Sequence, residues 1–207
     1  MIRLSVTWLD LFASYMDDEE QTAEAFAMRL FGPFEPTLEM RAGTALHSVL
    51  EHAKETDDLV SILRSGADGF SFTIDEAVDG VIELGDSREQ KYLLNILPDV
   101  VLSGRIDAET ALYPIDHKLT GQFDAERYMN SLQWKAYLLM RNKRRFVYQV
   151  FERGPIVSQD GFSHCHIKDY HRLEVAAYPH MMNDVREVAA GLAEFVKEWK
   201  PRFVAAS

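Results

Sequence analysis

One short stretch of the chain, residues 103–120, brings two carboxylates and an ammonium group together. Its residue types predict a β-hairpin with a turn centred at residues 111–112. Asp116 and Lys118 are two residues apart, so their side chains lie on the same face of a strand. The turn places Asp107 opposite Asp116 on that face, where directly opposed Cβ atoms are about 4.5–5.5 Å apart.

Two ionised carboxylates at that separation repel each other, and the arrangement is costly unless a cation lies between them. Oxygen ligands suit Mg²⁺ or Mn²⁺. The hairpin therefore predicts a divalent-metal site between Asp107 and Asp116. The same residues are also typical of a solvated surface strand, and no Asn-Gly or Asp-Gly pair fixes the register of the turn.

Two pairs of polar residues lie four positions apart on predicted helices, so that each pair shares one face. His47 and Glu51 belong to a helix expected to begin at Gly43-Thr44. Gln133 and Tyr137 belong to the longest predicted helix, residues 124–142, which starts with an aspartate and ends with basic residues, as the helix dipole favours. Either pair is also compatible with a purely structural role.

The rest of the chain alternates between predicted helices and strands. Strands are expected at residues 70–74, 90–96, 100–108, 145–152 and 162–170, the last two separated by a Gly-Pro turn, and helices at residues 7–15, 22–30, 59–64 and 176–199, the last ending before Pro201. Residues 75–84 fit a helix or a turn and strand equally well. This order predicts an α/β or α+β fold, with one central mixed β-sheet flanked by helices.

Length, hydrophobic content and cysteine count limit the classes of protein to which this chain can belong. A chain of 207 residues with 47% hydrophobic content can form one domain with a sizeable core. It has no run of about 20 apolar residues that would span a membrane, and its acidic N-terminal segment is unlike a signal peptide, so we expect a soluble, cytoplasmic protein. The single cysteine, Cys165, excludes an internal disulfide and any metal cluster held by four thiolates of this chain.

A second metal site is conceivable at His164-Cys165-His166, with His171 beyond. On a strand the two outer histidines share a face and Cys165 points away, so the three side chains do not converge without a bulge. Satisfied or exposed histidines are the favoured interpretation.

Four short motifs follow one another along the chain: Gly43-x-x-x-His47-x-x-x-Glu51, Gly104-Arg-Ile-Asp107, Ile115-Asp116-His117-Lys118 and Gln133-x-x-x-Tyr137. In this order they resemble the PD-(D/E)xK nuclease superfamily, specifically its RecB-like exonuclease branch. The match covers about half of the chain, and each motif is weak by itself.

The resemblance implies a restriction-endonuclease-like core at residues 43–170, preceded by a helical part at 1–42 and followed by a C-terminal helix at 171–207, all in one nuclease domain. It implies one or two Mg²⁺ or Mn²⁺ ions bound by His47, Asp107, Asp116 and the backbone carbonyl of His117. Lys118 would be the catalytic lysine, with Gln133 and Tyr137 positioning the nucleic-acid strand. The iron–sulfur cluster of some relatives needs cysteines that this chain lacks. Leu119 stands where the family usually has Thr or Ser, which leaves the role of the Thr120 hydroxyl open.

The implied activity is that of a stand-alone, metal-dependent deoxyribonuclease, an exonuclease rather than an endonuclease, acting on single- or double-stranded linear DNA in recombination, repair or phage DNA processing. A strand-annealing or recombination protein and a second copy of the chain are the expected partners. The net charge of −11 restricts DNA contact to a local basic surface. The candidates for it are Lys135, Arg141, Lys143, Arg144 and Arg145. The alternatives are a catalytically silent DNA-binding or assembly subunit and a phosphoesterase for small substrates.

Overall fold

The computed structural model describes residues 1–54, 63, 66–74, 82–159 and 161–204. Its elements follow one another as β1 (Ile2–Ser5), α1 (Val6–Asp17), α2 (Ala23–Phe31), α3 (Leu38–His52), β2 (Phe70–Ile74), β3 (Ser87–Leu97), β4 (Val100–Glu109), β5 (Pro114–Thr120), α5 (Ala125–Asn130), α6 (Leu132–Arg141), β6 (Arg145–Gln159), β7 (Phe162–Ala176) and α7 (Met181–Val204). Among these residues, no helix is both long enough and apolar enough to cross a membrane.

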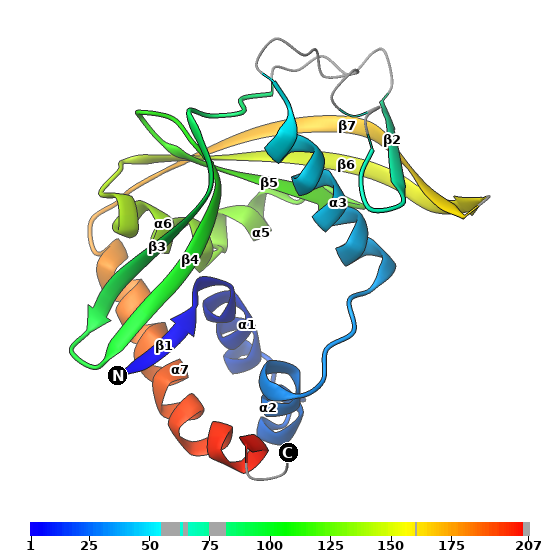
Figure 1. Ribbon diagram of the computed structural model, residues 1–207. Helices are drawn as coiled ribbons and strands as arrows, with labels where there is room; N and C mark the ends of the chain where they lie inside the picture. The colour runs from blue at the N-terminus through cyan, green and yellow to red at the C-terminus, as the bar shows by residue number, and fades with distance from the viewer. Residues whose placement is uncertain (55–62, 64–65, 75–81, 160, 205–207) are drawn as a thin grey trace.

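The described strands form one seven-stranded mixed sheet in the order β1-β4-β5-β6-β7-β2, with β3 also paired to β4. The pairs β1–β4, β5–β6 and β2–β7 are parallel, and the others are antiparallel. Helices flank the sheet (Figure 1). The predicted fold class, an α/β core with a central mixed sheet flanked by helices, is therefore confirmed.

Strand β4 organises the sheet because it is shared by three partners. One edge pairs with β3 along most of its length. The other edge pairs with β1 at residues 100–103 and with β5 at Ala108 and Glu109. Between these two pairings, residues 104–107 have no ladder partner on this edge among the described residues, and the sheet is open there.

The two faces of the sheet are covered by different helices. Along β6, Phe146, Tyr148 and Val150 pack into the core beneath α1, α6 and α7, whereas Phe151 belongs to the core beneath α3. This alternation follows from the period of two in a strand. Figure 1 shows α3 crossing β5, β6 and β7 on its own face of the sheet.

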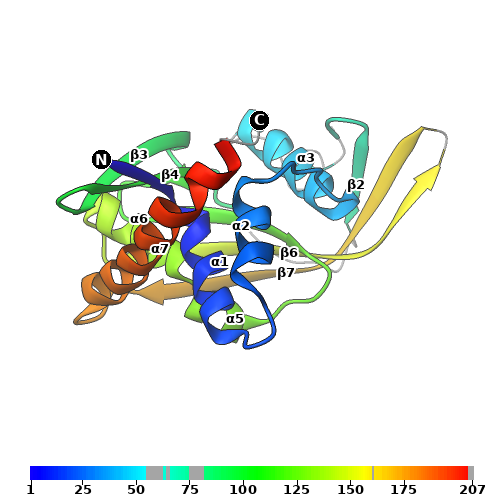
Figure 2. The same cartoon turned by 90° about the horizontal axis from the view of Figure 1, so that it is seen from below.

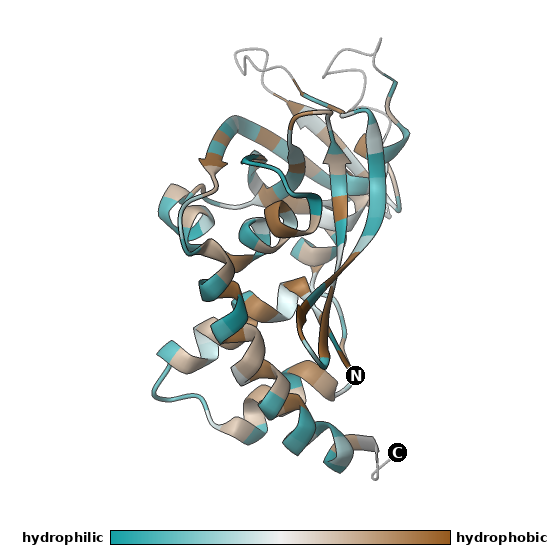
Figure 3. Cartoon of the chain, turned by 90° about the vertical axis from the view of Figure 1, so that its left-hand side faces the viewer, coloured by the Kyte–Doolittle hydropathy of each residue, from teal (hydrophilic) through white to brown (hydrophobic). Residues whose placement is uncertain are grey.

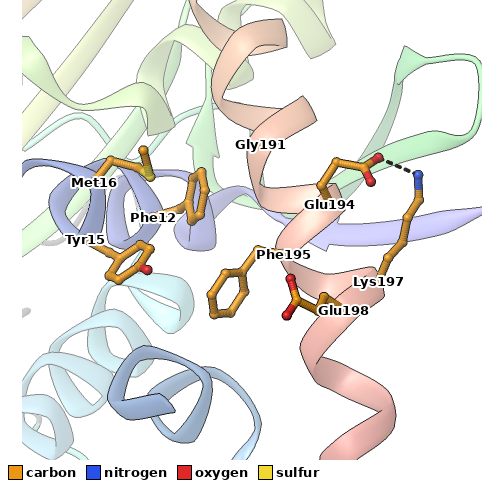
Figure 4. Close-up of a pocket in the computed structure, with 8 residues that line it drawn as sticks. All are labelled: Phe12, Tyr15, Met16, Gly191, Glu194, Phe195, Lys197 and Glu198. Carbon is orange, nitrogen blue, oxygen red and sulfur yellow. Dashed lines mark hydrogen bonds and ion pairs between the residues drawn. The ribbon is translucent and has the colours of Figure 1, made fainter. Parts of the chain in front are cut away.

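Helices α1, α2 and α7 form a helical layer beside the β1 edge, as the view from below in Figure 2 shows. Rings of Phe12, Tyr15, Phe26 and Phe195 pack there with centroids 4.5–6.1 Å apart. A pocket of about 500 Å³ between α1 and α7 is rimmed by charged residues of α7 (Figure 4). The end of the β3–β4 hairpin that meets this layer is strongly hydrophobic (Figure 3).

Several predicted boundaries were wrong, one because of a local helix cap and another because of a contact between distant parts of the chain. Helix α3 begins at Leu38 rather than Gly43, since the Thr37 hydroxyl caps it by accepting from the N–H of Met40. The single helix expected at residues 124–142 is two helices, broken at Ser131. The predicted helix at residues 59–64 lies outside the described residues, apart from residue 63, and so does most of the ambiguous segment 75–84.

The last two strands are longer than predicted, and the last helix has the predicted length but lies five residues further along the chain. The Gly154-Pro155 pair lies inside β6, at a shift of register, and β6 continues to Gln159 before β7 begins at Phe162. A proline at a bulge removes no ladder hydrogen bond, which explains why the strand continues. Helix α7 passes Pro201, and Phe203 beyond it packs on Phe31 with ring centroids 5.6 Å apart.

We predict that Gly104→Ala destabilises the fold by about 1–3 kcal/mol, because the added methyl group would lie 2.5 Å from Cε1 of Tyr137. The matched control is Gly43→Ala, which meets no atom within 4 Å inside helix α3 and should stabilise by about 0.5–1 kcal/mol. Urea unfolding curves of both variants check this. Equal shifts in the two variants would contradict the packing argument.

Candidate active site

The site lies where β4 and β5 separate. Continuing the register from Ala108–Ile115 would set Asp107 opposite Asp116, as predicted, but the backbone pairing among described residues ends at Ala108–Ile115. Beyond that point Oδ2 of Asp107 accepts a hydrogen bond from the His117 N–H at 2.8 Å. A side-chain carboxylate thus takes the place of a backbone carbonyl and holds the two strands apart.

Helix α3 brings His47 to this opening. Its buried residues, among them Leu46 and Leu50, fix the helix on the sheet. The Nδ1 atom of His47 then lies 3.5 Å from Oδ2 of Asp107. The predicted pairing of a helical histidine with the hairpin aspartate is therefore present in the structure.

Strand β5 carries Asp116 and Lys118 on one face, as their spacing predicted. Their side chains form an ion pair with 2.7 Å between Oδ2 and Nζ. The Asp116 side chain is only 2% exposed, whereas that of Lys118 is 31% exposed and reaches the solvent-filled side of the site. A buried carboxylate beside a partly exposed ammonium group can hold a cation and still present the lysine to a substrate.

Gln133 and Tyr137 approach from helix α6 on the other face of the sheet. The Tyr137 hydroxyl donates to the carbonyl of Arg105 at 2.7 Å and accepts from Nε2 of Gln133 at 3.3 Å. Both side chains are buried. The pair is therefore anchored on the open segment of β4.

The start of helix α6 is fixed by Asp10 of α1. Its carboxylate accepts from the Ser131 hydroxyl at 2.7 Å and from the backbone N–H of Leu132. The Ser131 hydroxyl in turn caps the helix by accepting from the Gln133 N–H at 3.1 Å. These bonds explain the helix break at Ser131, and they set the position of Gln133.

Burial and mutual charge shift the acid pKa values apart. Burial raises the pKa of Asp116 to about 6, with the Asp107 charge acting the same way and Lys118 against it. Burial also acts to raise the pKa of Asp107, but the hydrogen bond to His47 and the neighbouring positive charges outweigh it, so that pKa is lowered. Asp107 is thus the member of the pair that ionises more readily.

The basic groups are shifted by the same neighbours. Burial acts to lower the pKa values of His47 and Lys118, yet the carboxylates of Asp107 and Asp116 outweigh it and raise both. Burial lowers the pKa of His117 to about 4, so its ring is neutral at pH 7. The proposed metal-binding role of the His117 carbonyl stays a prediction.

Glu89 of β3 joins this group, and sequence reasoning missed it. It lies between Arg88 and Gln90, whose ladder partners Ala108 and Ile106 flank Asp107, and its backbone is left-handed at φ 54°. One ligand atom each from His47, Glu89 and Asp107 lies within 4.8 Å of the others, and Asp116 is outside this set. No spacing rule marks a residue whose side chain reaches the site through an unusual backbone conformation, and no signal in the sequence distinguishes Glu89 from a solvated glutamate.

The site opens into two clefts. The larger, about 830 Å³, is lined by α3, β4 and β5, including His47, Asp107 and Asp116. The second, about 670 Å³, lies between α1 and α5. Lys118, Leu119 and Gln133 line both, so the clefts meet at the catalytic candidates. The Thr120 hydroxyl lines the second cleft and bonds within its own turn, donating to the Gln122 carbonyl at 2.7 Å.

The predicted DNA-binding residues lie away from both clefts, and most are held by acidic or carbonyl groups. Lys135 is 3.6 Å from Asp184, Arg141 is 2.7 Å from Glu109, Arg145 is 3.5 Å from Glu174, Lys143 donates to the Ala111 carbonyl, and Arg144 is exposed. None of the five lines either cleft. Their role in DNA binding stays a prediction.

The rival site on β7 does not assemble among the described residues. Nδ1 of His164 bonds to Ser71 at 2.6 Å, and Nδ1 of His166 bonds to Thr73 at 3.0 Å. Cys165 points into the core, as the strand period requires. His171 stacks on Phe123 and contacts Glu152.

Comparison with known proteins identifies the fold. No protein-family model and no curated protein matches the sequence. An alkaline exonuclease from Laribacter hongkongensis superposes with a TM-score of 0.51 at 14% identity, covering 99% of this chain and 93% of that one. A candidate exonuclease from Eubacterium rectale superposes with a TM-score of 0.50 at 9% identity, covering 94% and 80%. At these identities the likeness establishes a shared fold.

The side chains at the opening between β4 and β5 are suitable ligands for a hard divalent cation. Two carboxylates and an imidazole lie at the opening, and the buried Oδ2 atom of Asp116 is paired with Nζ of Lys118 at 2.7 Å. Oxygen-rich sites take Mg²⁺ or Mn²⁺, and an imidazole nitrogen shifts the preference toward Mn²⁺.

We predict that divalent-cation affinity rises as the pH increases through about 6, the pKa of Asp116. Asp116 and His47, whose pKa the neighbouring carboxylates raise, must both lose a proton before they bind a cation. The slope should approach tenfold per pH unit for each proton displaced. Calorimetric titration with Mn²⁺ in buffers of different ionisation enthalpy measures both affinity and proton release. Asp116→Asn should release about one proton fewer, and a flat pH profile would contradict the assignment.

Proposed function

We propose that this protein is a divalent-metal-dependent nuclease that hydrolyses phosphodiester bonds of DNA, as an exonuclease rather than an endonuclease. The observation that carries this is the convergence of Asp107, Asp116 and Lys118 at the opening between β4 and β5, where two clefts meet. The shared fold with proteins described as exonucleases supports it.

The chemistry needs a cation because the substrate and the nucleophile repel each other. Asp107, Asp116 and His47 would hold the metal, which screens the phosphate charge and lowers the pKa of water. Lys118 keeps its proton, because the two carboxylates raise its pKa. It therefore orients the attacking water and stabilises developing negative charge as a hydrogen-bond donor, and it does not serve as the base.

Gln133 and Tyr137 contribute by positioning the nucleic-acid strand. The Tyr137 hydroxyl links Gln133 to the backbone of β4 beside Asp107. Gln133 lines both clefts, so a strand that passes from one cleft to the other meets its side chain. We therefore infer that Gln133 contacts the substrate and that Tyr137 supports it from behind.

The two clefts offer a path for the strand despite the acidic composition. The first is lined by Lys91 and Arg105 and the second by Arg29 and Arg127, with Lys118 common to both. Cations along a groove attract a phosphate backbone locally, and their effect is strongest at low salt. A partner protein and self-association remain predictions from the family resemblance.

The decisive test is digestion of end-labelled linear and circular DNA, single- and double-stranded, with Mg²⁺, Mn²⁺ or chelator. We expect metal-dependent loss of linear DNA, reduced at least about 10²-fold in Lys118→Ala. Asp116→Asn should lose more than Gln133→Ala, because the metal supports several steps at once. Glu24→Gln, at an exposed position of α2 outside both clefts, is the charge-matched control. Cleavage of none of these substrates would favour a silent binding subunit, and cleavage of a small chromogenic diester alone would favour a phosphoesterase.

We predict that cleft cations, rather than the basic run, bind the DNA backbone. In an Asp116→Asn background, Arg127→Ala and Arg29→Ala should weaken DNA binding and each lower the slope of log affinity against log salt by about 0.7–0.9. Arg144→Ala is the matched control on the basic run. Fluorescence anisotropy at several salt concentrations measures the slopes. A larger effect of Arg144→Ala would assign the DNA to the basic run instead.

A further inference from the structure

Arg88 of β3 joins the sheet to the end of helix α3. Its Nη1 atom donates to the carbonyls of Leu50, Glu51 and Ala53 at 2.5–3.1 Å, and its Nε atom donates to the carbonyl of Leu84 at 3.1 Å. The carbonyls in the last turn of a helix have no partner within the helix, and a cation at that end is also favoured by the helix dipole. One guanidinium thus caps α3 and connects it to a strand.

This connection lies between the two elements that carry His47 and Asp107. In the β3–β4 ladder Arg88 is paired with Ala108, which directly follows Asp107 in the chain. On the helix side, His47 precedes Leu50 by three residues, which is about one turn of α3. The guanidinium therefore bridges α3 and the β3–β4 pair at a point one helical turn from the histidine and one ladder position from the aspartate.

The contacts of Arg88 are directional, whereas the packing of α3 on the sheet is not. The buried face of α3 consists of small and aliphatic side chains, namely Ala42, Ala45, Leu46, Val49 and Leu50. Because the burial of apolar surface is non-directional, it limits sliding of a helix along its axis only weakly. Hydrogen bonds weaken steeply when their length or angle changes. The bonds of Arg88 therefore oppose a displacement of α3 that its apolar face would tolerate.

Arg88 takes no part in the surface that a DNA strand would contact. It lines neither the larger cleft nor the second cleft. Its effect on the candidate site must therefore pass through α3, whose His47 has its Nδ1 atom 3.5 Å from Oδ2 of Asp107.

We propose that Arg88 is a positioning residue for the candidate metal site, and that it sets the place of His47 relative to Asp107 by holding the last turn of α3 against β3. The inference rests on the proposed nuclease function, in which both residues bind the cation, and it adds to that site a residue outside the four motifs. Ligands that are already held in place bind a cation without the cost of ordering them first. Loss of the Arg88 bonds should therefore weaken cation binding.

Titration of Arg88→Ala with Mn²⁺ by calorimetry tests the proposal without relying on activity. We expect the dissociation constant for Mn²⁺ to rise about tenfold, at the lower end of what loss of a group that supports a metal ligand costs. In the cleavage assay the Mn²⁺ concentration that gives half the maximal rate should rise in parallel, while kcat at saturating Mn²⁺ changes little. Leu192→Ala, which removes a fully buried side chain of α7, is the control for lost stability alone and should keep its Mn²⁺ affinity.

Two further measurements distinguish positioning from a general loss of structure. Guanidinium chloride, added far below the concentrations that unfold proteins, should restore part of the Mn²⁺ affinity of Arg88→Ala, whereas NaCl at the same ionic strength should not. In a His47→Ala background, Arg88→Ala should cause no further loss of Mn²⁺ affinity, because a residue that acts through another is not additive with it.

Circular dichroism and urea unfolding check that each variant is folded. Arg88→Lys keeps the charge but lacks the planar fork, so its Mn²⁺ affinity should lie between those of the unaltered protein and Arg88→Ala. It takes the place of Arg88→Ala in every measurement except the guanidinium addition if the alanine variant does not fold.

The outcomes separate this proposal from the nuclease function. Unchanged Mn²⁺ affinity in Arg88→Ala, or a loss that is equally large in the His47→Ala background, would overturn the positioning role; metal-dependent DNA cleavage by the unaltered protein would still support the nuclease function. Mn²⁺ affinity that depends on Arg88 through His47, in a protein that cleaves no DNA, would overturn the nuclease function alone. No bound Mn²⁺ and no cleavage by the unaltered protein would overturn both.

Discussion

The hydrogen bond from the His117 N–H to the Asp107 carboxylate is the constraint on which the site depends. A closed ladder between β4 and β5 would leave α3 and α6 on opposite faces of a continuous sheet. Because the ladder ends early, His47 from one face and Tyr137 from the other reach the same segment of β4. Asp107 is held in place because its carboxylate accepts from the His117 N–H of β5 and also contacts His47 of α3.

The charges at the candidate site nearly balance one another, although the protein as a whole is acidic. Asp107 and Asp116 are offset in the cation-free protein by Lys118 and by a His47 whose pKa is raised. Loading one divalent cation on a neutral His47 changes the charge of this group from near zero to about +1 when Lys118 is counted. The field at the opening then differs in sign from the average field of the surface.

Local sequence patterns predicted much of this site, whereas its other features depend on the conformation of the folded chain. The hairpin, the shared face of Asp116 and Lys118, and the helical pair of Gln133 and Tyr137 follow from periods of two and 3.6 residues. The break at Ser131 could not be predicted, because it is made by Asp10, about 120 positions earlier in the chain. Glu89 could not either, because a left-handed residue inside a strand contradicts the alternation on which strand prediction relies.

The pairing of β1 with β4 has a consequence for how the chain folds. Residues 2–5 pair with residues 100–103, and the helix that follows β1 supplies Asp10 to the start of α6. Loop-closure entropy delays contacts between such distant segments, so proteins rich in them fold slowly. His47 of α3 is synthesised well before β4, β5 and α6, and it meets Asp107 only after the chain has closed on itself. A nascent chain that ends before β4 therefore contains His47 but not the aspartates beside it, and the candidate site assembles at the same step as the long-range pairing of the sheet.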